Sequence, residues 1–561
     1  MTGIGSCAIP DRTIRCDSRV SALCGPGEWP KTAGRWDAVD ADFAFDRGPD
    51  AALIADLSAD LRDAGYTADA VRDAWGALAD TAVGHGLHGP ALTALAGRTD
   101  AAATLARLLF LGVGTARDAV DAALPRVGAA GLERLALARI DGDEVVPQAL
   151  LRPQDYGGTG DAGDTGDTGE WWIASDLDEA ALGGPLPTGH VLGVGGASLT
   201  LAGLQLTTPV ERVLDVGTGC GIQALRARRA AASVVATDVS ERALALTRLN
   251  ALLNGVDGIQ TRHGSLFEPV AGERFDRVVS NPPFVITPRV AGVPEYEYRD
   301  AGFAGDDLVA AFVSGVGAVL APGGTAQLLG NWEYRAGADG LDRVQEWVAA
   351  SEVPLEAWVI EREQLDPLAY AELWVRDGGT APGTRGTPGT PGYADLVGAW
   401  LADFAARGVT GIGFGYLLLR RPASGAPRLA RYERVTQPLG DGLGAHLGQA
   451  LAAFDALAAL DDDALAATCP VVAGDVTEAR HHLPGAEAPS VIELRQGGGL
   501  ARTLEVDPAL AALVGASDGE LTAGQLIDAI ADLLEVDAAA LRADLLPRVR
   551  ELVFTGFLRL A

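Results

Sequence analysis

Apolar residues at helical spacing dominate the first part of the chain. After residue 46 they recur on one helix face, beginning with Leu53, Ile54, Leu57 and Leu61, as a helix buried on one side requires. Helical patterns continue to about residue 139, and short strand-like pieces follow at 145–151 and 171–174. Helices closed by a pair of strands predict a mainly helical, winged-helix-like module over residues 46–170.

The middle of the chain alternates strand-like apolar runs with helical patterns, from residue 171 to residue 437. Such alternation predicts an α/β fold in which a mostly parallel, Rossmann-like sheet is covered by helices on both faces. We expect seven strands, with the last two forming a hairpin. They are placed at 212–216, 233–237, 260–263, 274–280, 325–329, 357–361 and 410–419.

Residues 438–561 return to helical patterns and end in a strand-like run. Thr522 and Gln525 have the spacing of a capping box, in which each side chain bonds the other residue's backbone amide at the start of a helix. This part predicts a second mainly helical, winged-helix-like module.

Three segments lack any such pattern. Residues 1–45 mix glycine, proline, cysteine and charge without periodicity, which predicts a disordered tail. A low-complexity tract of glycine, aspartate and threonine at 157–169 interrupts the N-terminal module. Residues 378–392 repeat glycine, threonine and proline, which predicts a flexible surface insertion in the α/β region.

Charge and composition narrow the classes of function. The 561 residues carry a net charge of −31 at pH 7, which disfavours nucleic acid as a partner without excluding it, because phosphates attract basic surfaces. Neither an apolar run of membrane length nor a secretory signal is visible, so we expect a cytoplasmic protein with no membrane partner. The five cysteines and seven histidines lack the spacing of zinc ligands, and no metal site is expected.

A glycine-rich turn follows the first predicted strand of the α/β region. Glycines in such a turn allow tight backbone bends and leave no side chain between the backbone and a bound nucleotide. A dinucleotide-binding turn would have glycine or alanine where this chain has Ile222, so nicotinamide and S-adenosylmethionine both stay open at this point. The candidate cofactor residues here are Asp215, Gly217, Thr218, Gly219, Cys220 and Gly221.

Asp238 closes the second predicted strand of the same region. A carboxylate at this position can accept two hydrogen bonds from ribose hydroxyls in either class of nucleotide-binding protein. It is the candidate ribose ligand.

The turn Asn281, Pro282, Pro283 and Phe284 ends the fourth predicted strand and predicts the reaction. An amide or exocyclic amine is a weak nucleophile because its lone pair is delocalised. The Asn281 side-chain oxygen and the Pro282 carbonyl can accept both N–H hydrogens of such a group, which fixes its lone pair toward an electrophile. The prolines hold these acceptors in place, and Phe284 can stack on a planar target.

These motifs together resemble the small-domain methyltransferase superfamily. The resemblance covers about 140 residues, from His190 to Trp332, and includes Asn250 and Asn254 at the end of the helix after Asp238. Within the superfamily the chain is similar to release-factor glutamine methyltransferases and to adenine or guanine N-methyltransferases that act on RNA. Release-factor enzymes of bacteria usually have tyrosine where this chain has Phe284, and the flanking modules differ from theirs.

The resemblance implies S-adenosylmethionine as the cofactor. It places Asp215 near the amino-acid portion of that cofactor, and Ser265 with Leu266 near the adenine. A buried acid such as Asp215 is otherwise costly in an apolar strand.

Three hypotheses follow for the function. The first is an N-methyltransferase that acts on a protein glutamine amide, with a translation release factor as the kind of partner. The second is an adenine N-methyltransferase that acts on RNA or DNA, which has to extrude the base into its pocket. The third is a catalytically silent interaction protein that keeps the methyltransferase fold.

Overall fold

The computed structural model describes residues 50–155, 169–183, 186–187, 189–290, 293, 299, 302–387 and 390–560. All of them belong to one compact unit, Phe45–Ala561. The predicted disordered tail at 1–45 lies outside the described residues, and so does the low-complexity tract at 157–169 apart from Gly169.

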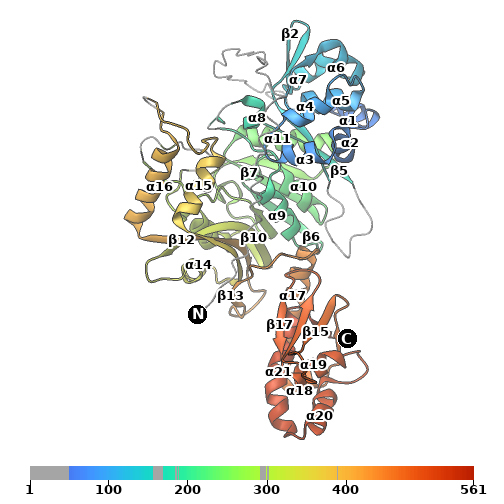
Figure 1. Ribbon diagram of the computed structural model, residues 1–561, viewed down its shortest axis with the longest axis vertical. Coiled ribbons are helices and arrows are strands. Elements are labelled where there is room, and N and C mark those ends of the chain that lie inside the picture. Colours follow the sequence, from blue (N-terminus) through green and yellow to red (C-terminus); the bar gives the residue numbers. More distant parts are fainter. Residues whose placement is uncertain are drawn as a thin grey trace. The chain divides into compact units, whose positions relative to one another are not determined.

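An eight-stranded sheet forms the centre of the described chain (Figure 1), in the order β13-β11-β12-β10-β9-β6-β7-β8. The strands from β8 to β10 run parallel to one another, whereas β12 is antiparallel to both of its neighbours. The Rossmann-like α/β prediction is therefore confirmed. The strands are β6 (Val210–Val216), β7 (Ala231–Asp238), β8 (Ile259–His263), β9 (Phe275–Ser280), β10 (Leu320–Arg335), β11 (Glu356–Leu365), β12 (Val409–Arg420) and β13 (Ala430–Arg434).

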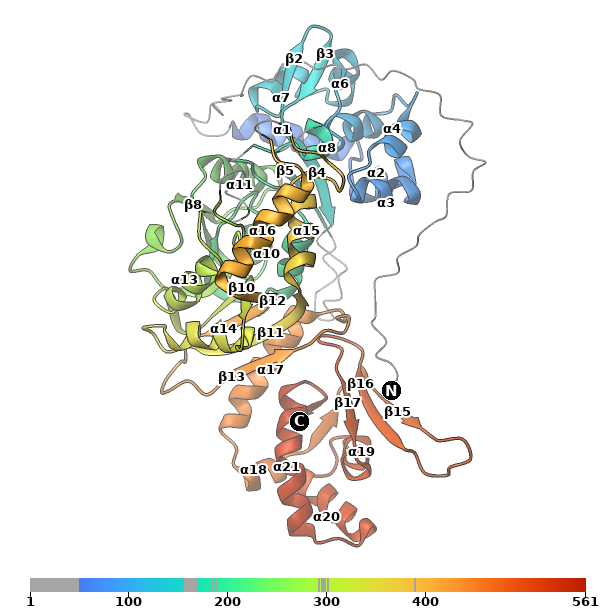
Figure 2. The same ribbon diagram turned by 60° about the vertical axis from the view of Figure 1, so that its left-hand side comes forward.

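Two details of the sheet differ from the prediction. The sheet has eight strands and not seven, because β13 adds an edge strand whose sequence is mostly charged and partly exposed. β11 and β12 pair antiparallel as expected, but two helices separate them along the chain, so they do not form a hairpin. These helices are α15 (Pro367–Asp377) and α16 (Tyr393–Arg407), which lie side by side (Figure 2).

Helices cover the sheet on both faces, and its central strands are therefore buried on both sides. Leu328 of β10 packs into the core on the face of α13 and α14, while the next residue, Leu329, packs into the core on the opposite face with α9 and α17. The helices of this region are α9 (Gly196–Leu204), α10 (Ile222–Arg228), α11 (Glu241–Leu253), α13 (Asp307–Val316) and α14 (Gly340–Ala349).

Seven α-helices, a π-helix and a small sheet precede this region among the described residues. The sheet has the order β1-β3-β2, and its hydrophobic core continues into α10 and α11. The winged-helix assignment of this part stays a prediction. The elements are α1 (Ala51–Asp63), α2 (Ala68–Trp75), α3 (Ala77–Gly84), α4 (Gly89–Leu95), α5 (Ala101–Leu105), the π-helix η1 (Ala106–Phe110), β1 (Thr115–Ala116), α6 (Arg117–Ala123), α7 (Gly128–Arg134), β2 (Ala138–Asp141) and β3 (Glu144–Pro147).

An antiparallel pair of strands joins the N-terminal part to the α/β region. β4 (Leu150–Asp155) pairs along its whole length with β5 (Glu170–Ser175). The expected boundary between residues 170 and 171 therefore falls inside this pair, and the domain limits stay a prediction. A short helix, α8 (Glu179–Leu182), follows β5.

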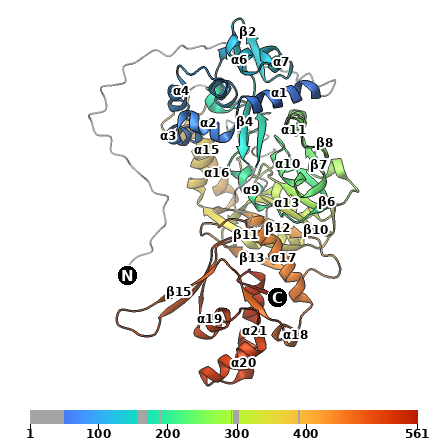
Figure 3. The same cartoon turned by 90° about the vertical axis from the view of Figure 1, so that its right-hand side faces the viewer.

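The C-terminal part contains helices, a two-stranded and a three-stranded sheet (Figure 3). Its core is continuous with the sheet, since Trp358 and Leu418 belong to the same cluster as Leu447 and Phe557. The capping box of Thr522 and Gln525 is present, while the winged-helix assignment stays a prediction. The elements are α17 (Leu443–Ala458), α18 (Asp462–Ala466), β14 (Pro470–Val472), β15 (Val476–His481), β16 (Val491–Gln496), β17 (Thr503–Val506), α19 (Pro508–Gly515), α20 (Ala523–Leu534), α21 (Ala538–Phe554) and β18 (Leu558–Leu560).

No helix among the residues given above is both long enough and apolar enough to cross a bilayer.

Candidate active site

The predicted site residues lie where parallel strands end. Asp215 is the second-last residue of β6, Asp238 is the last residue of β7, and Asn281 directly follows β9. Since β6 lies between β7 and β9 in the sheet, these three ends meet at one edge. The carboxyl edge of an open parallel sheet is where such folds bind ligands.

The glycine turn after β6 has the backbone that the sequence predicts. Gly217, Gly219 and Gly221 have φ of 73°, 55° and 86°, values that residues with a side chain rarely adopt. A Cβ atom on Gly217 or Gly219 would meet nothing within 4 Å, whereas one on Gly221 would lie 3.0 Å from Thr247. The first two glycines thus border open space that a ligand can fill, and the third allows α11 to approach closely.

Asp215 is fully buried beneath this turn. One of its carboxylate oxygens accepts a 2.6 Å hydrogen bond from the Thr218 hydroxyl. The other, Oδ1, has no hydrogen-bond partner among the described residues, and burial raises the pKa of the carboxyl to about 7. A buried acceptor without a partner is costly, and an ammonium group of a ligand would satisfy it. The residue therefore fits the amino-acid portion of S-adenosylmethionine.

Asp238 is held against the same turn. Its carboxylate accepts hydrogen bonds from the Gly219 amide at 3.0 Å and from the Ser240 amide at 2.9 Å. The next residue, Val239, is 52% exposed, so an apolar surface lies beside the acid. Sequence reasoning missed Val239, because a single valine after a strand carries no signal of its own.

Ser265 and Leu266 form the turn after β8. The backbone amide of Gly264, just before them, donates to the Asp238 carbonyl at 3.0 Å, which brings the turn next to the ribose candidate. Leu266 has φ of 45°, a left-handed conformation that is rare for a residue with a branched side chain. Such strain is typical of functional turns. The roles of Ser265 and Leu266 at an adenine stay predictions.

The Asn281 turn carries a second buried acceptor without a partner. Its strand is fastened to β6, because the Ser280 hydroxyl donates to the Val216 carbonyl at 2.7 Å. The Asn281 side-chain oxygen is buried and has no hydrogen-bond partner among the described residues. Phe284 packs its ring against that of Phe414 on β12, with 5.6 Å between the ring centroids.

Three residues beside this turn escaped sequence reasoning. The Tyr370 hydroxyl of α15 accepts hydrogen bonds from the Ile286 amide at 3.0 Å and from the Asn331 side chain at 2.6 Å. Asn331 lies directly opposite Phe414 in the β10–β12 pair, and its own side-chain oxygen is buried without a partner among the described residues. No motif marks them, since they become neighbours of the turn only through the sheet and α15.

Tyr296, Tyr298 and Arg299 form an aromatic and basic group in the sequence. Of these three residues the structure describes Arg299. The Arg299 side chain is buried and donates to Asp377 at the end of α15 at 2.6 Å.

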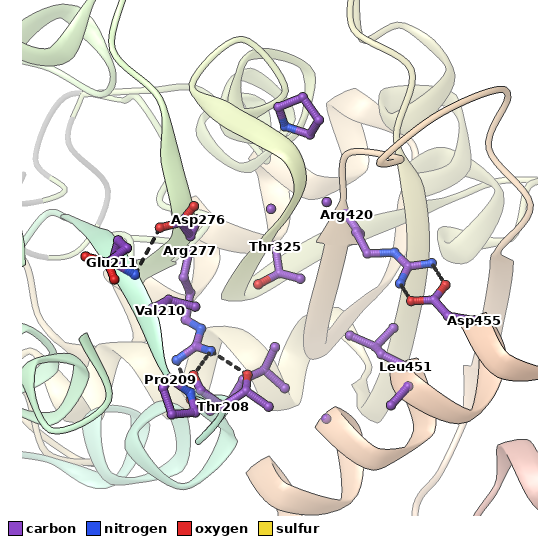
Figure 4. A pocket seen from close by; sticks show the side chains of 16 residues that line it. Thr208, Pro209, Val210, Glu211, Asp276, Arg277, Thr325, Arg420, Leu451 and Asp455 are labelled. Carbon is purple, nitrogen blue, oxygen red and sulfur yellow. Dashed lines mark hydrogen bonds and ion pairs between the residues drawn. The ribbon is translucent and has the colours of Figure 1, made fainter. Parts of the chain in front are cut away.

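A cavity of about 610 Å³ lies at the other edge of the sheet (Figure 4). Pro209 and Val210 at the start of β6, Asp276 and Arg277 at the start of β9, and α17 line it. The Arg277 guanidinium is used within the protein, because it donates to the Thr208 carbonyl and hydroxyl at 2.8 and 2.9 Å. The cavity is therefore separate from the carboxyl ends at which the candidate residues meet.

The sheet order and the residues at its carboxyl edge fit the methyltransferase class that the sequence resembles. Residues 195–292 match the family model described as methyltransferase small domain, so the chain carries a methyltransferase domain of this family. S-adenosylmethionine is the cofactor of the domain, as predicted, and the Asp215, glycine-turn and Asp238 geometry fits it. Residues 63–148, in the N-terminal part, match a domain of unknown function (DUF7059).

Three curated proteins are similar to this region. The release factor glutamine methyltransferase of Xylella fastidiosa (strain Temecula1 / ATCC 700964) is 38% identical over 134 residues, which are 22% of this chain and 49% of the relative. That of Deinococcus radiodurans is 42% identical over 125 residues, 21% of this chain and 44% of the relative. The ribosomal protein uL3 glutamine methyltransferase of Bordetella pertussis is 32% identical over 167 residues, 28% of this chain and 56% of the relative. The chain thus spans about half the length of the curated relatives it matches.

Proposed function

We propose that the protein is an S-adenosylmethionine-dependent N-methyltransferase that methylates a glutamine side-chain amide of a protein. The observation that carries this proposal is the buried Asn281 oxygen, which has no hydrogen-bond partner among the described residues. It is an acceptor that an incoming N–H group would satisfy, at the strand end next to the cofactor residues.

The chain's own residues account for the chemistry. The Asn281 oxygen and the Pro282 carbonyl accept the two N–H hydrogens of the target, which holds its lone pair toward the cofactor. Bound S-adenosylmethionine supplies an electrophilic methyl group. Phe284 and Phe414, already in ring contact, wall in the planar amide. No catalytic base is needed, because the methylated nitrogen can lose its proton to water.

Two observations support a protein substrate. All three relatives described above bear names of glutamine methyltransferases that act on proteins. The net charge of −31 opposes a nucleic acid, since like charges repel over a distance of about 8 Å at physiological ionic strength. A translation factor of the release-factor kind is the proposed partner, and the cytoplasm, where such factors act, is the proposed location.

Methyl transfer from labelled S-adenosylmethionine tests the proposal. Purified full-length protein and its Asn281→Ala variant are incubated with lysate of the source cells, and the products are digested separately with protease and with nuclease. We expect label that only protease releases and that the variant does not produce, and mass spectrometry should place it on glutamine. Label released only by nuclease would replace the glutamine substrate with adenine, and binding of the cofactor without any transfer would mean a silent methyltransferase fold.

A further inference from the structure

Side chains on one face of α11 form hydrogen bonds with two separate segments of the chain. Thr247, Asn250 and Asn254 lie along this face, which helix periodicity brings to the same side. The segments they hold are β5 of the N-terminal strand pair and the glycine turn after β6.

Asn250 and Asn254 pair with β5 as a neighbouring strand would. The Asn254 side chain accepts from the Trp172 amide and donates to the Trp172 carbonyl, both at 2.9 Å. The Asn250 side chain does the same with Ala174, at 2.8 and 3.0 Å. Two side-chain amides thus satisfy both polar backbone groups of two β5 residues.

Of these two asparagines, Asn250 also reaches the cofactor turn. Its Nδ2 donates a second hydrogen bond to the Cys220 carbonyl at 2.7 Å, and the Thr247 hydroxyl donates to the Gly219 carbonyl at 3.0 Å. Asn250 is completely buried. Both of its N–H hydrogens and its oxygen are used, so a shift of either segment would leave a buried polar group without a partner.

β5 is in turn fixed to the N-terminal part. The Trp172 indole donates to the Tyr66 carbonyl at 2.7 Å, and the Tyr66 hydroxyl donates to the Leu151 carbonyl of β4 at 2.8 Å. The Ser58 hydroxyl of α1 donates to the Leu253 carbonyl at the end of α11 at 2.6 Å. Displacement of the N-terminal part would therefore act on β5 and on α11 together.

We propose that Asn250 is a positioning residue that couples the N-terminal strand pair to the cofactor turn. The N-terminal part, which includes the domain of unknown function, then influences the cofactor affinity through Asn250. This inference rests on the proposed binding of S-adenosylmethionine at the glycine turn, but not on the identity of the methyl acceptor. Because coupling between two sites is reciprocal, bound cofactor must also stabilise β5.

Asn254 provides a matched control. Asn250→Ala removes the bonds to β5 and to Cys220, whereas Asn254→Ala removes only bonds to β5 and within α11. We expect both variants of the full chain to melt earlier than the wild type by similar amounts. Only Asn250→Ala should raise the Kd for S-adenosylmethionine in calorimetric titration, by about tenfold, because the Cys220 carbonyl is left buried without a donor.

Equal Kd changes in the two variants, or none, would overturn the coupling. Where Asn250→Ala does not fold, Asn250→Leu serves instead, with Asn254→Leu as its control, because leucine keeps a similar volume but can neither accept from Ala174 nor donate to Cys220. A wild type that does not bind S-adenosylmethionine would refute the cofactor site itself, and a wild type that binds without methylating glutamine would refute only the proposed substrate.

Hydrogen exchange distinguishes coupling through Asn250 from a purely structural role of this residue. In the wild type, saturating S-adenosylmethionine should slow the hydrogen exchange of both the Trp172 and the Ala174 amide. In Asn254→Ala, it should still slow the exchange of the Ala174 amide. In Asn250→Ala the cofactor should leave the exchange of both amides unchanged. Equal protection in Asn250→Ala would show that the cofactor reaches β5 by another route and would overturn the proposal.

Discussion

The two halves of the candidate site satisfy their polar groups differently. On the cofactor side, the carboxylates of Asp215 and Asp238 bond to the glycine turn between them, so much of the geometry is fixed within the protein. On the substrate side, the buried side-chain oxygens of Asn281 and Asn331 have no partner among the described residues. The cofactor side is thus largely preformed, with one acceptor, Asp215 Oδ1, left without a partner among the described residues. The substrate side keeps more of its hydrogen-bonding capacity in reserve for a polar, planar target.

The largest effect should come from the substrate side. Asn281→Ala removes the acceptor that holds the target nitrogen, and we expect kcat to fall by about 100-fold to 1,000-fold, in the range seen for other preorganised transition-state contacts. The Kd for S-adenosylmethionine should stay within about threefold of the wild type, since that side keeps its own bonds. Single-turnover methylation with calorimetry separates the two quantities. Full activity of the variant would refute the mechanism.

The opposite pattern is expected for the cofactor side. Asp238→Ala removes a carboxylate that accepts from the Gly219 amide and that we propose as the ribose acceptor, so the Kd for S-adenosylmethionine should rise by about 10-fold to 100-fold. At saturating cofactor, kcat should recover most of its value. An unchanged Kd in titration would mean that the ribose binds elsewhere.

Tyr370 tests whether the residues that sequence reasoning missed belong to the substrate side. Tyr370→Phe leaves the Ile286 amide and the Asn331 side chain without their common acceptor, so the Asn281 turn should lose its fixed position. We expect kcat/KM for the protein substrate to fall by about tenfold with cofactor affinity unchanged. The control is Tyr393→Phe, because the Tyr393 hydroxyl has no partner among the described residues. Equal effects of the two changes would make Tyr370 a packing residue.

The smallest expected effect is a pH dependence of cofactor binding. Burial raises the pKa of Asp215 to about 7, so the carboxyl is mostly neutral at about pH 6 and half ionised at about pH 7. An ammonium group binds the ionised form, and the cofactor's amino group stays protonated over this interval, so affinity should increase about fivefold as the pH rises. Asp215→Asn should abolish the dependence, and a flat titration of the wild type would contradict the assigned ligand.

The same pKa shift has a consequence for stability. The folded-state pKa of Asp215 lies above its ordinary value, so the folded protein binds more protons than the unfolded chain between about pH 4 and pH 7. Stability of the cofactor-free protein should therefore fall as the pH rises through this interval.

Much of this arrangement was predictable from the sequence, for physical reasons. The glycine turn and the Asn281 turn are local, so their residues are adjacent in the chain and carry their own backbone requirements. Strands buried on both faces give apolar stretches, such as Val278 and Val279 of β9. β13 was missed because an exposed edge strand needs no such run. Asn331, Tyr370 and Phe414 were missed because only the insertion of β12 beside β10 and the packing of α15 bring them together.

The antiparallel strand β12 has a consequence for how the protein is made. Strands β6 to β10 pair with one another, and the last of them ends at Arg335. β11 pairs only with β12 and β13, which are synthesised after two intervening helices. Since a chain folds as it leaves the ribosome, from its N-terminal end, the cofactor half completes its sheet first. The growing chain thus acquires the proposed place for the methyl donor before it acquires Phe414, one of the two proposed walls around the methyl acceptor.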